Sequence, residues 1–245
     1  MRLALVSDIH GNLAALEAVA ADIRRRGADS VINLGDNLSG PLLPLETAQF
    51  LMSSGWLSLA GNHERQLLAC HPGAGSGSDG YARAQLTGLE LDWLRSLRPA
   101  HQLTEEILLC HGTPDSDCTY FLESNHHGVL SLASESEIAR RLGNVVSSVI
   151  ACGHTHLPRS VRLATGQLVV NPGSVGVQAF SDDQSGFHIM ETGSPDARYA
   201  IIEKTGSGWL VEHRCVPYDH KSMAALARLR GRPEWEVALL RGRVR

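Results

Sequence analysis

The stretch that decides the fold is Leu3-Ala4-Leu5-Val6-Ser7-Asp8-Ile9-His10-Gly11-Asn12-Leu13, in which an apolar run passes directly into polar residues and a glycine. The run predicts a short buried strand over residues 2–7. Residues 12–26 then carry apolar side chains at the spacing of one helix face, and Gly27 provides a helix stop. A strand therefore leads into a helix at the start of the chain, with Asp8 and His10 at the junction.

The same alternation continues through the first half of the chain. The predicted elements that follow are a strand over 30–34, a helix over 45–52, a strand over 56–59 and helices over 65–69 and 81–97. Strands that alternate with helices in this way are typical of an α/β fold. Residues 72–80 are rich in Gly and Ser, so we expect a loop there that is either a lid or a tolerated insertion.

The second half of the chain is mostly β. Short apolar or β-branched runs predict strands over 106–110, 147–152, 168–170, 186–190, 199–203 and 209–215. The turn sequence Thr205-Gly206-Ser207-Gly208 predicts a hairpin between the last two. Because the chain shows no internal repeat and no linker, we expect one domain over residues 1–245, built as two stacked sheets with outer helices.

Composition and charge exclude several classes of protein. The chain has 245 residues, a net charge of -4 and 43% hydrophobic residues, values of a globular protein rather than of a disordered or nucleic-acid-wrapping one. No apolar run reaches membrane-span length, and no signal peptide is expected. The five cysteines are scattered without a CxxC pair, so we expect a cytoplasmic protein without disulfides. Residues 220–245 are basic and predict a C-terminal helical tail with a solvated face.

Five short motifs each begin where a predicted strand ends. They are Asp8-Ile9-His10, Gly35-Asp36, Gly61-Asn62-His63-Glu64, Cys110-His111-Gly112 and Gly153-His154-Thr155-His156. In open α/β sheets, ligands bind in the crevice at the carboxyl ends of the strands, so we expect the motifs to converge on one crevice. One such motif alone usually means a turn or a hydrogen-bonded core histidine, but five at strand ends indicate a site.

Seven side chains in these motifs are candidate metal ligands: Asp8, His10, Asp36, Asn62, His111, His154 and His156. Residues two apart in an extended chain point the same way, so the members of Asp8-x-His10 can face one ion or two neighbouring ions. Seven donors exceed the needs of one tetrahedral site, and a carboxylate such as Asp36 can bridge two ions. Imidazole and carboxylate donors suit Mn, which we expect first, or Fe, Zn or Ni.

The formal charge of such a site favours an anion. Two divalent cations outweigh Asp8, Asp36 and one hydroxide when the histidines are neutral. Because metals lower the pKa of bound water, a hydroxide bound to the dinuclear centre can attack a phosphorus atom whose oxygens the ions polarise. His63 is not needed as a ligand, and we expect it to protonate the leaving oxygen as a general acid, with Glu64 orienting it.

The motif series from Asp8 to His156 resembles the signature of the calcineurin-like metallophosphoesterase superfamily over residues 1–176, and residues 7–13 and 171–176 resemble its small prokaryotic phosphodiesterase branch. The resemblance implies a four-layer α/β/β/α sandwich, in which two mixed β-sheets are flanked by helices. It assigns the ions as follows: Asp8, His10, Asp36 and His156 hold one, and Asp36, Asn62, His111 and His154 hold the other. It also implies that His63 is catalytic.

We expect a small phosphoester as substrate, and a phosphodiester in particular. The protein phosphatases and dinucleoside tetraphosphatases of the superfamily carry an arginine shortly after Gly-Asp that clamps phosphate, whereas this chain continues from Asp36 as Asn-Leu-Ser-Gly-Pro. A monoanionic diester is then favoured over a dianionic monoester, unless Arg65 supplies the missing charge. Asn12, Glu64 and Arg65 are the further candidates for supporting or substrate-contacting residues.

Three other functions are considered. The first is a phosphomonoesterase acting on a phosphoprotein or a nucleotide. The second is a non-catalytic scaffold for partner proteins on the same fold, which the presence of His63 disfavours. The third is a nuclease, which the acidic charge disfavours.

Overall fold

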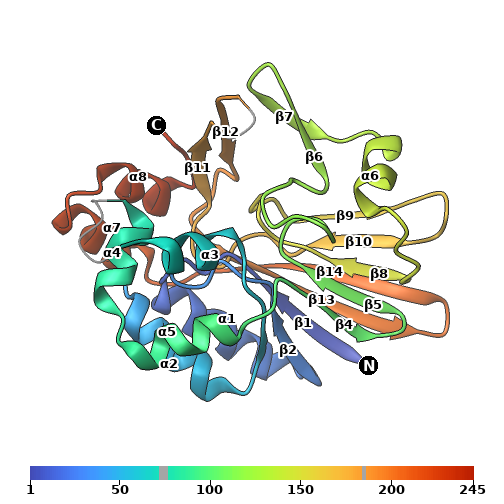
Figure 1. Cartoon of the computed structure of the whole chain (residues 1–245), viewed down its shortest axis with the longest axis horizontal. Helices are drawn as coiled ribbons and strands as arrows, with labels where there is room; N and C mark the ends of the chain where they lie inside the picture. Colours follow the sequence, from blue (N-terminus) through green and yellow to red (C-terminus); the bar gives the residue numbers. More distant parts are fainter. Residues whose placement is uncertain (72–76, 184–185) are drawn as a thin grey trace.

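Two five-stranded β-sheets pack face to face (Figure 1). The computed structural model describes residues 1–71, 77–183 and 186–245. The first sheet has the order β14-β13-β1-β2-β3, with the bounds Gly208–Val216 (β14), Ala197–Thr205 (β13), Arg2–Val6 (β1), Ser30–Asn33 (β2) and Leu57–Ser58 (β3). Because β1 pairs in parallel with β2 but antiparallel with β13, this sheet is mixed.

The second sheet has the order β4-β5-β8-β10-β9, with the bounds Ala100–Thr104 (β4), Ile107–Cys110 (β5), Val149–Ala151 (β8), Leu168–Asn171 (β10) and Arg159–Arg162 (β9). It is mixed too, because β8 runs parallel to both β5 and β10, while β4 and β9 are antiparallel edge strands. The predicted strands thus exist with slightly different ends, and β4 and β9 are additions that the sequence analysis missed.

Apolar side chains fill the space between the sheets and cover their outer faces. On the side of the first sheet, Leu5 and Leu34 pack against Leu109 and Val170 of the second sheet in one buried cluster. Helix α1 (Leu13–Arg26) and helix α2 (Pro44–Ser54) cover the other face of the first sheet, and α6 (Glu135–Leu142) covers the other face of the second. The chain is therefore the expected four-layer α/β/β/α sandwich.

Helices α3 (Asn62–Ala69), α4 (Ser78–Gln85) and α5 (Gly88–Ser96) follow β3 and share an apolar cluster with α2. The prediction of one helix over 81–97 was wrong, because the chain breaks at Thr87. The Thr87 side chain accepts from the Leu89 backbone N–H, and Glu90 accepts from the Thr87 N–H, so a new helix begins there. Of the expected loop over 72–80, residues 72–76 lie outside the described residues and 78–80 begin α4.

Two small hairpins stand on the edge of the sandwich. They are β6 (Glu123–His126) with β7 (Val129–Leu132), and β11 (Ala179–Asp182) with β12 (His188–Glu191). The sequence analysis missed β6, β7 and β11. In the described ranges, no helix combines the length and apolar character needed to cross a membrane.

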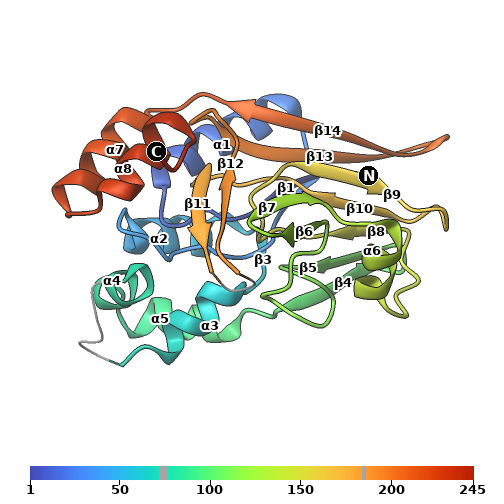
Figure 2. The ribbon, with the colours of Figure 1, turned by 90° about the horizontal axis from the view of Figure 1, so that it is seen from above.

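The basic C-terminal segment is helical, as predicted, but it forms two helices, α7 (His220–Leu229) and α8 (Pro233–Arg241), which pack on the rest of the chain by one face. Ala224, Ala227 and Leu239 pack with Leu42 in a buried cluster. Arg230 donates to the backbone carbonyl of Pro41 at 2.7 Å and also contacts that of Leu42. Figure 2 shows that this packing places α8 beside β11, next to the edge where the motif loops end.

Candidate metal centre

The loops that carry the motifs are joined to one another by backbone hydrogen bonds. The N–H of Asp8 donates to the carbonyl of Gly35 at 2.9 Å, and the N–H of His10 donates to that of Asp36 at 3.0 Å. In the second sheet, the N–H of Gly153 donates to the carbonyl of His111 at 2.7 Å. The convergence predicted from the strand ends is therefore present.

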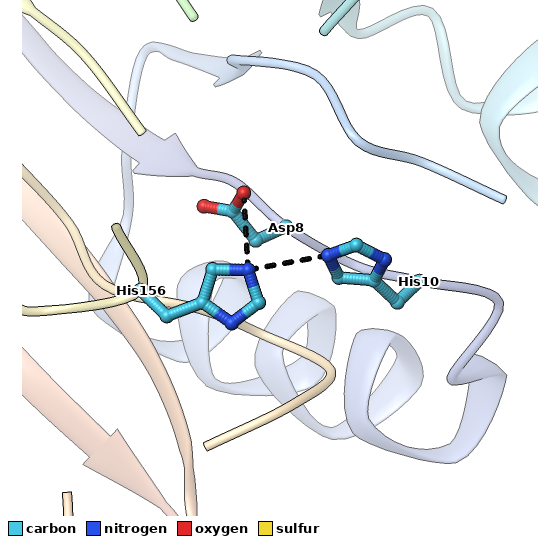
Figure 3. A group of neighbouring side chains, drawn as sticks. All are labelled: Asp8, His10 and His156. Atoms are coloured by element: carbon cyan, nitrogen blue, oxygen red, sulfur yellow. Dashed lines mark hydrogen bonds and ion pairs between the residues drawn. The ribbon is translucent and has the colours of Figure 1, made fainter. Parts of the chain in front are cut away.

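Six of the seven candidate ligands form two buried triads. In the first, donor atoms of Asp8, His10 and His156 lie within 4.8 Å of one another, and in the second those of Asp36, His111 and His154 do so. Figure 3 shows the first triad, in which Nε2 of His156 lies 3.5 Å from Oδ1 of Asp8 and 3.2 Å from Nε2 of His10. Each triad provides both imidazole and carboxylate donors, which divalent transition metals bind.

Five of these residues have a left-handed backbone, which is unusual for residues other than glycine. Such a conformation costs about 1–2 kcal/mol for an L-residue, and strain of this kind gathers at functional sites. The φ angles are 56° for Asp8, 52° for His10, 56° for Asp36, 69° for His154 and 58° for His156. The strands turn sharply at these residues, and the turn directs the side chains inward.

Backbone carbonyls fix the orientation of all four imidazole rings. Nδ1 of His10, His111 and His156 lies 2.7–2.8 Å from a carbonyl oxygen, of Ser39, Leu34 and Val177 respectively. A carbonyl only accepts, so each Nδ1 carries a proton, and in the neutral ring Nε2 presents its lone pair to the site. His154 is reversed, since its Nε2 lies 3.0 Å from the carbonyl of Cys118 and Nδ1 is left for the site.

The charges of the triads call for a cation. Burial lowers the pKa of His10 and of His154 to about 4, so both rings are neutral at pH 7. Burial raises the pKa of the Asp8 carboxyl to about 7. Burial also disfavours a charge on His111, but Asp36, whose Oδ2 lies 3.1 Å from Nε2, outweighs it and raises the pKa of His111 to about 10. A divalent cation would satisfy these carboxylates and the facing lone pairs of His10 and His156.

Asn62 and Gly61 fit the same interpretation. Oδ1 of Asn62 is buried without a hydrogen-bond partner in the described structure, a costly state that a metal bond would relieve. Gly61 precedes it at the start of α3, and a Cβ there would lie 2.8 Å from Nε2 of His111 and would also collide with Asp36. Glycine thus lets the backbone pass beside the second triad.

A cavity of about 420 Å³ opens onto both triads. His10, Asp36, Asn62, His154 and His156 line it together with His63, so all the sequence-predicted ligands except Asp8 and His111 reach its surface. Asp8 and His111 lie behind them and are fully buried. A ligand in the cavity would therefore contact the metal site and His63 at once.

The sequence model of the calcineurin-like phosphoesterase superfamily domain matches residues 1–194 of this chain. The chain belongs to this superfamily. Its members are metal-dependent phosphoester hydrolases, and the two triads are candidate sites for their divalent metals.

Two solved structures resemble this chain over nearly its whole length. A metallophosphoesterase from Sphaerobacter thermophilus has a TM-score of 0.76 and 24% identity, with 99% of both chains covered. A hypothetical protein from Pyrococcus horikoshii OT3 has a TM-score of 0.75 and 17% identity, with 98% of both covered. An uncharacterized protein of Methanocaldococcus jannaschii is 39% identical over 66 residues, which make up 27% of each chain. The structural likeness shows a common fold.

The contacts of Glu64 and Arg65 differ from those we expected. Glu64 does not bond to the ring of His63. Its carboxylate accepts from the backbone N–H groups of Asp36 and Asn37 at 2.8 Å and of Gly61 at 2.7 Å, so it holds two ligand loops together. Arg65 makes two bonds to Asp117, at 2.8 and 2.9 Å, and does not line the cavity.

Asn12 also does not line the cavity. Its Oδ1 caps α1 by accepting from the N–H of Ala15, and its Nδ2 donates to the carbonyl of Gly176 at 2.8 Å. This side chain therefore fixes the loop after β1 against residues 171–176, which is a supporting contact.

Asp79 on α4 contacts His63 and was not among the residues singled out from the sequence. Its Oδ1 lies 2.9 Å from Nδ1 of His63. Burial lowers the pKa of His63, but the negative charges of Asp36 and Asp79 outweigh this effect and raise it to about 9. The pair fixes which ring nitrogen is free, because Nδ1 is held by Asp79 and Nε2 is left for a ligand.

The C-terminal helix α8 was missed as a wall of the cavity. Arg232, Glu234, Trp235 and Ala238 line it, although the segment lies beyond the region matched by the family model. The only signal in the sequence was the break at Gly231-Arg232-Pro233, where proline can begin a new helix.

Proposed function

We propose that this protein is a phosphodiesterase with a dinuclear metal centre. Asp8, His10 and His156 would hold one ion, and His111, His154 and Asn62 the other, with Asp36 shared between them. The observation that carries the proposal is the pair of buried triads, each with donor atoms within 4.8 Å, on one cavity. Manganese is the metal we expect, with Fe, Zn and Ni as alternatives, because the donors are imidazole and carboxylate.

Two divalent cations, when bound, supply positive charge to the phosphate oxygens and lower the pKa of water. The chain's own residues supply orientation and a proton. The backbone N–H of His63 donates to Oδ1 of Asp36 at 3.0 Å, so the start of α3 holds this carboxylate in place. Nε2 of His63 would give its proton to the leaving oxygen, while Asp79 holds Nδ1.

The arginines near the cavity are already paired with carboxylates, which supports a diester over a monoester as the substrate. Among the described residues that line it, Arg232 is the only Lys or Arg, and its Nε lies 2.6 Å from Oε1 of Glu234. Arg65, which could have taken the place of a clamp, is paired with Asp117. A second negative charge on the phosphate therefore has no free guanidinium to bind, so a monoanionic diester fits better.

We also propose that the substrate is a small phosphoester and that the protein works in the cytoplasm. No disulfide joins the five cysteines, which supports a reducing compartment. Cys110 and Cys152 are buried, and burial raises the pKa of both thiols, so they behave as core residues.

The test combines metal content with rates on two substrates. Freshly purified protein should contain two divalent ions per chain by elemental analysis, and should hydrolyse bis-p-nitrophenyl phosphate faster than p-nitrophenyl phosphate. On a diester with an alkyl leaving group, which needs the proton most, His63→Ala should lower kcat about 10²–10⁴-fold and keep both ions. His126→Ala, on an exposed residue of β6, is the matched control and should keep the full rate.

Each part of the proposal has its own contrary result. One ion per chain would overturn the dinuclear centre. Faster hydrolysis of the monoester would overturn the diester preference. An unchanged rate of His63→Ala on the diester with an alkyl leaving group would remove the acid role. A metal-loaded protein without turnover on any of these substrates would point to a scaffold.

A further inference from the structure

The cavity beside the metal triads is lined by aromatic rings. Aromatic residues make up only 5% of the chain, yet Tyr120, Phe180 and Trp235 all line this one cavity. Each ring packs against a different candidate ligand. The centroid of Trp235 lies 6.1 Å from that of His10, Phe180 lies 4.7 Å from His156, and Tyr120 lies 5.0 Å from His154.

The rings come from separate elements that are held at fixed positions. Trp235 is on α8 and Phe180 is on β11, and these two elements are in contact (Figure 2). Arg232, at the start of α8, donates to Oγ of Ser78 on α4 at 3.1 Å, and the guanidinium of Arg230 lies 5.0 Å from the ring centroid of Tyr81. These contacts hold α8 against the body of the protein, so the aromatic wall is preformed.

The remaining charges in the cavity disfavour a second phosphate. Apart from the candidate ligands and His63, the charged lining residues are Asp182, Arg232 and Glu234. Arg232 and Glu234 neutralise each other at 2.6 Å, so within the described lining no Lys or Arg is left to bind a further phosphate. A polyphosphate chain would lose hydration there without gaining a cation, whereas an uncharged ring system carries no such cost.

We propose that this cavity binds an uncharged planar ring of the nucleobase class, carried by the alcohol that stays on the phosphodiester after cleavage. Trp235 and Phe180 are its specificity-determining contacts. The proposal builds on the phosphodiesterase function above. A volume of about 420 Å³ leaves room for such a group beside the phosphate. Stacking on aromatic side chains is the usual way to bind a base, since every base has a flat π-face.

The test compares three diesters that release the same p-nitrophenolate. They carry thymidine through its 5′ oxygen, phenol or methanol as the second alcohol. We expect kcat/KM for the thymidine diester to exceed that for the methyl diester by at least about tenfold, as loss of one stacking contact predicts. The phenyl diester distinguishes a nucleobase from any ring, because a site built for a base prefers thymidine to phenyl.

Two variants on different elements test the contacts. Trp235→Leu and Phe180→Leu keep apolar bulk, and each should reduce the thymidine-to-methyl ratio about fivefold or more. Leu240→Ala, on the same helix as Trp235 but exposed and outside the cavity lining, should leave both the ratio and the basal rate unchanged. Equal thermal unfolding midpoints for the variants would show that the fold is retained.

A ratio near one in the wild type, or a ratio that survives both substitutions, overturns the proposal. A preference for phenyl over thymidine replaces the nucleobase with a simple aryl group and also counts against it. If no diester is hydrolysed, the phosphodiesterase function fails. Calorimetry then tests separately whether the cavity binds a nucleobase. Metal-loaded protein should bind thymidine 5′-monophosphate at least about tenfold more tightly than methyl phosphate, and equal binding overturns the site.

Discussion

Nδ1 of His63 lies 2.9 Å from Oδ1 of Asp79, a residue 16 positions later in the chain and on a different helix. Both side chains are partly exposed, at 30% and 22% of their surface. The bond fixes the plane of the imidazole and leaves Nε2 available for proton transfer. His63 belongs to a sequence motif and Asp79 does not, yet the two side chains form one hydrogen-bonded pair that can act as an acid.

The first prediction concerns this pair. Asp79→Asn should lower kcat on a diester about 10–100-fold with little change in KM, because the ring of His63 loses its orientation and not its place. The loss should be larger for an alkyl alcohol than for p-nitrophenol, since a poor leaving group needs the proton more. Steady-state kinetics on both kinds of diester give the measurement.

A double-mutant cycle separates positioning from a general structural effect. In a His63→Ala background, Asp79→Asn should have almost no further effect on kcat, because both changes remove the same step. Asp115→Asn, an exposed carboxylate outside the cavity lining, serves as the control. Additive losses in the double mutant would show that Asp79 acts independently of His63.

The second prediction concerns metal binding and stability. Nε2 of His10 and of His156 face each other at 3.2 Å, and both Nδ1 atoms are occupied by carbonyls, so the pair is stable only with a cation or a proton between them. Removing the metal with a chelator should therefore lower the thermal unfolding midpoint, and adding Mn²⁺ should restore it in a concentration-dependent way. An unfolding midpoint insensitive to chelation would contradict a metal at this triad.

The sequence indicated most of the fold and the ligand set, because strand ends and motif positions are local properties. The strand-to-loop passages at Asp8 and Asp36 are visible in the order of apolar and polar residues. The left-handed turns at these residues are not, since nothing in Asp-x-His requires a positive φ. They follow from tertiary bonds, such as the one from the Asp8 N–H to Gly35.

Long-range packing explains the residues that the sequence did not reveal. Asp79 stands in a Gly/Ser-rich stretch that reads as a loop, and only the packing of α4 against α3 brings it to His63. Trp235 lies in a basic segment that reads as a solvated tail, and its place in the cavity depends on the docking of α7 and α8 onto Leu42. Local patterns carry no information about such contacts.

The third prediction uses the close approach of the backbone at Gly61. Gly61→Ala would place a methyl group 2.8 Å from Nε2 of His111 and against Asp36, where the neighbours are rigid ligands. We expect loss of at least one metal ion per chain and a drop in kcat of at least about 100-fold, the cost of displacing metal ligands and their supports. Elemental analysis and diester kinetics measure the two effects.

Gly88→Ala is the matched control for this substitution. Gly88 is the first residue of α5, and no atom lies within 4 Å of a Cβ built there. Alanine also favours the helical state over glycine by up to about 1 kcal/mol. The control should keep its metal and its rate, and a Gly61→Ala protein that does the same would show that the site tolerates the methyl group.

The fourth prediction concerns stability and pH at Asp22 on α1. Its Oδ2 accepts from the hydroxyl of Tyr199 at 2.6 Å and from Nε of Arg26 at 2.7 Å. Burial disfavours the charge on Asp22, but these bonds outweigh burial and lower its pKa to about 2. The carboxylate ties α1 to β13, so its charged form stabilises the folded protein.

A lowered pKa gives a stabilisation that is complete above the unfolded-state value of about 4 and is lost as the pH falls toward the folded-state value. Asp22→Asn should therefore lower the free energy of unfolding by about 2 kcal/mol at pH 7, and the difference from wild type should shrink as the pH falls from about 5 to about 2. Urea denaturation across this range measures it. Asp92→Asn, which removes an exposed pair with Arg95, should cost less than about 0.5 kcal/mol. A difference at Asp22 that stays constant with pH would mean that packing, and not the charge, ties α1 to the sheet.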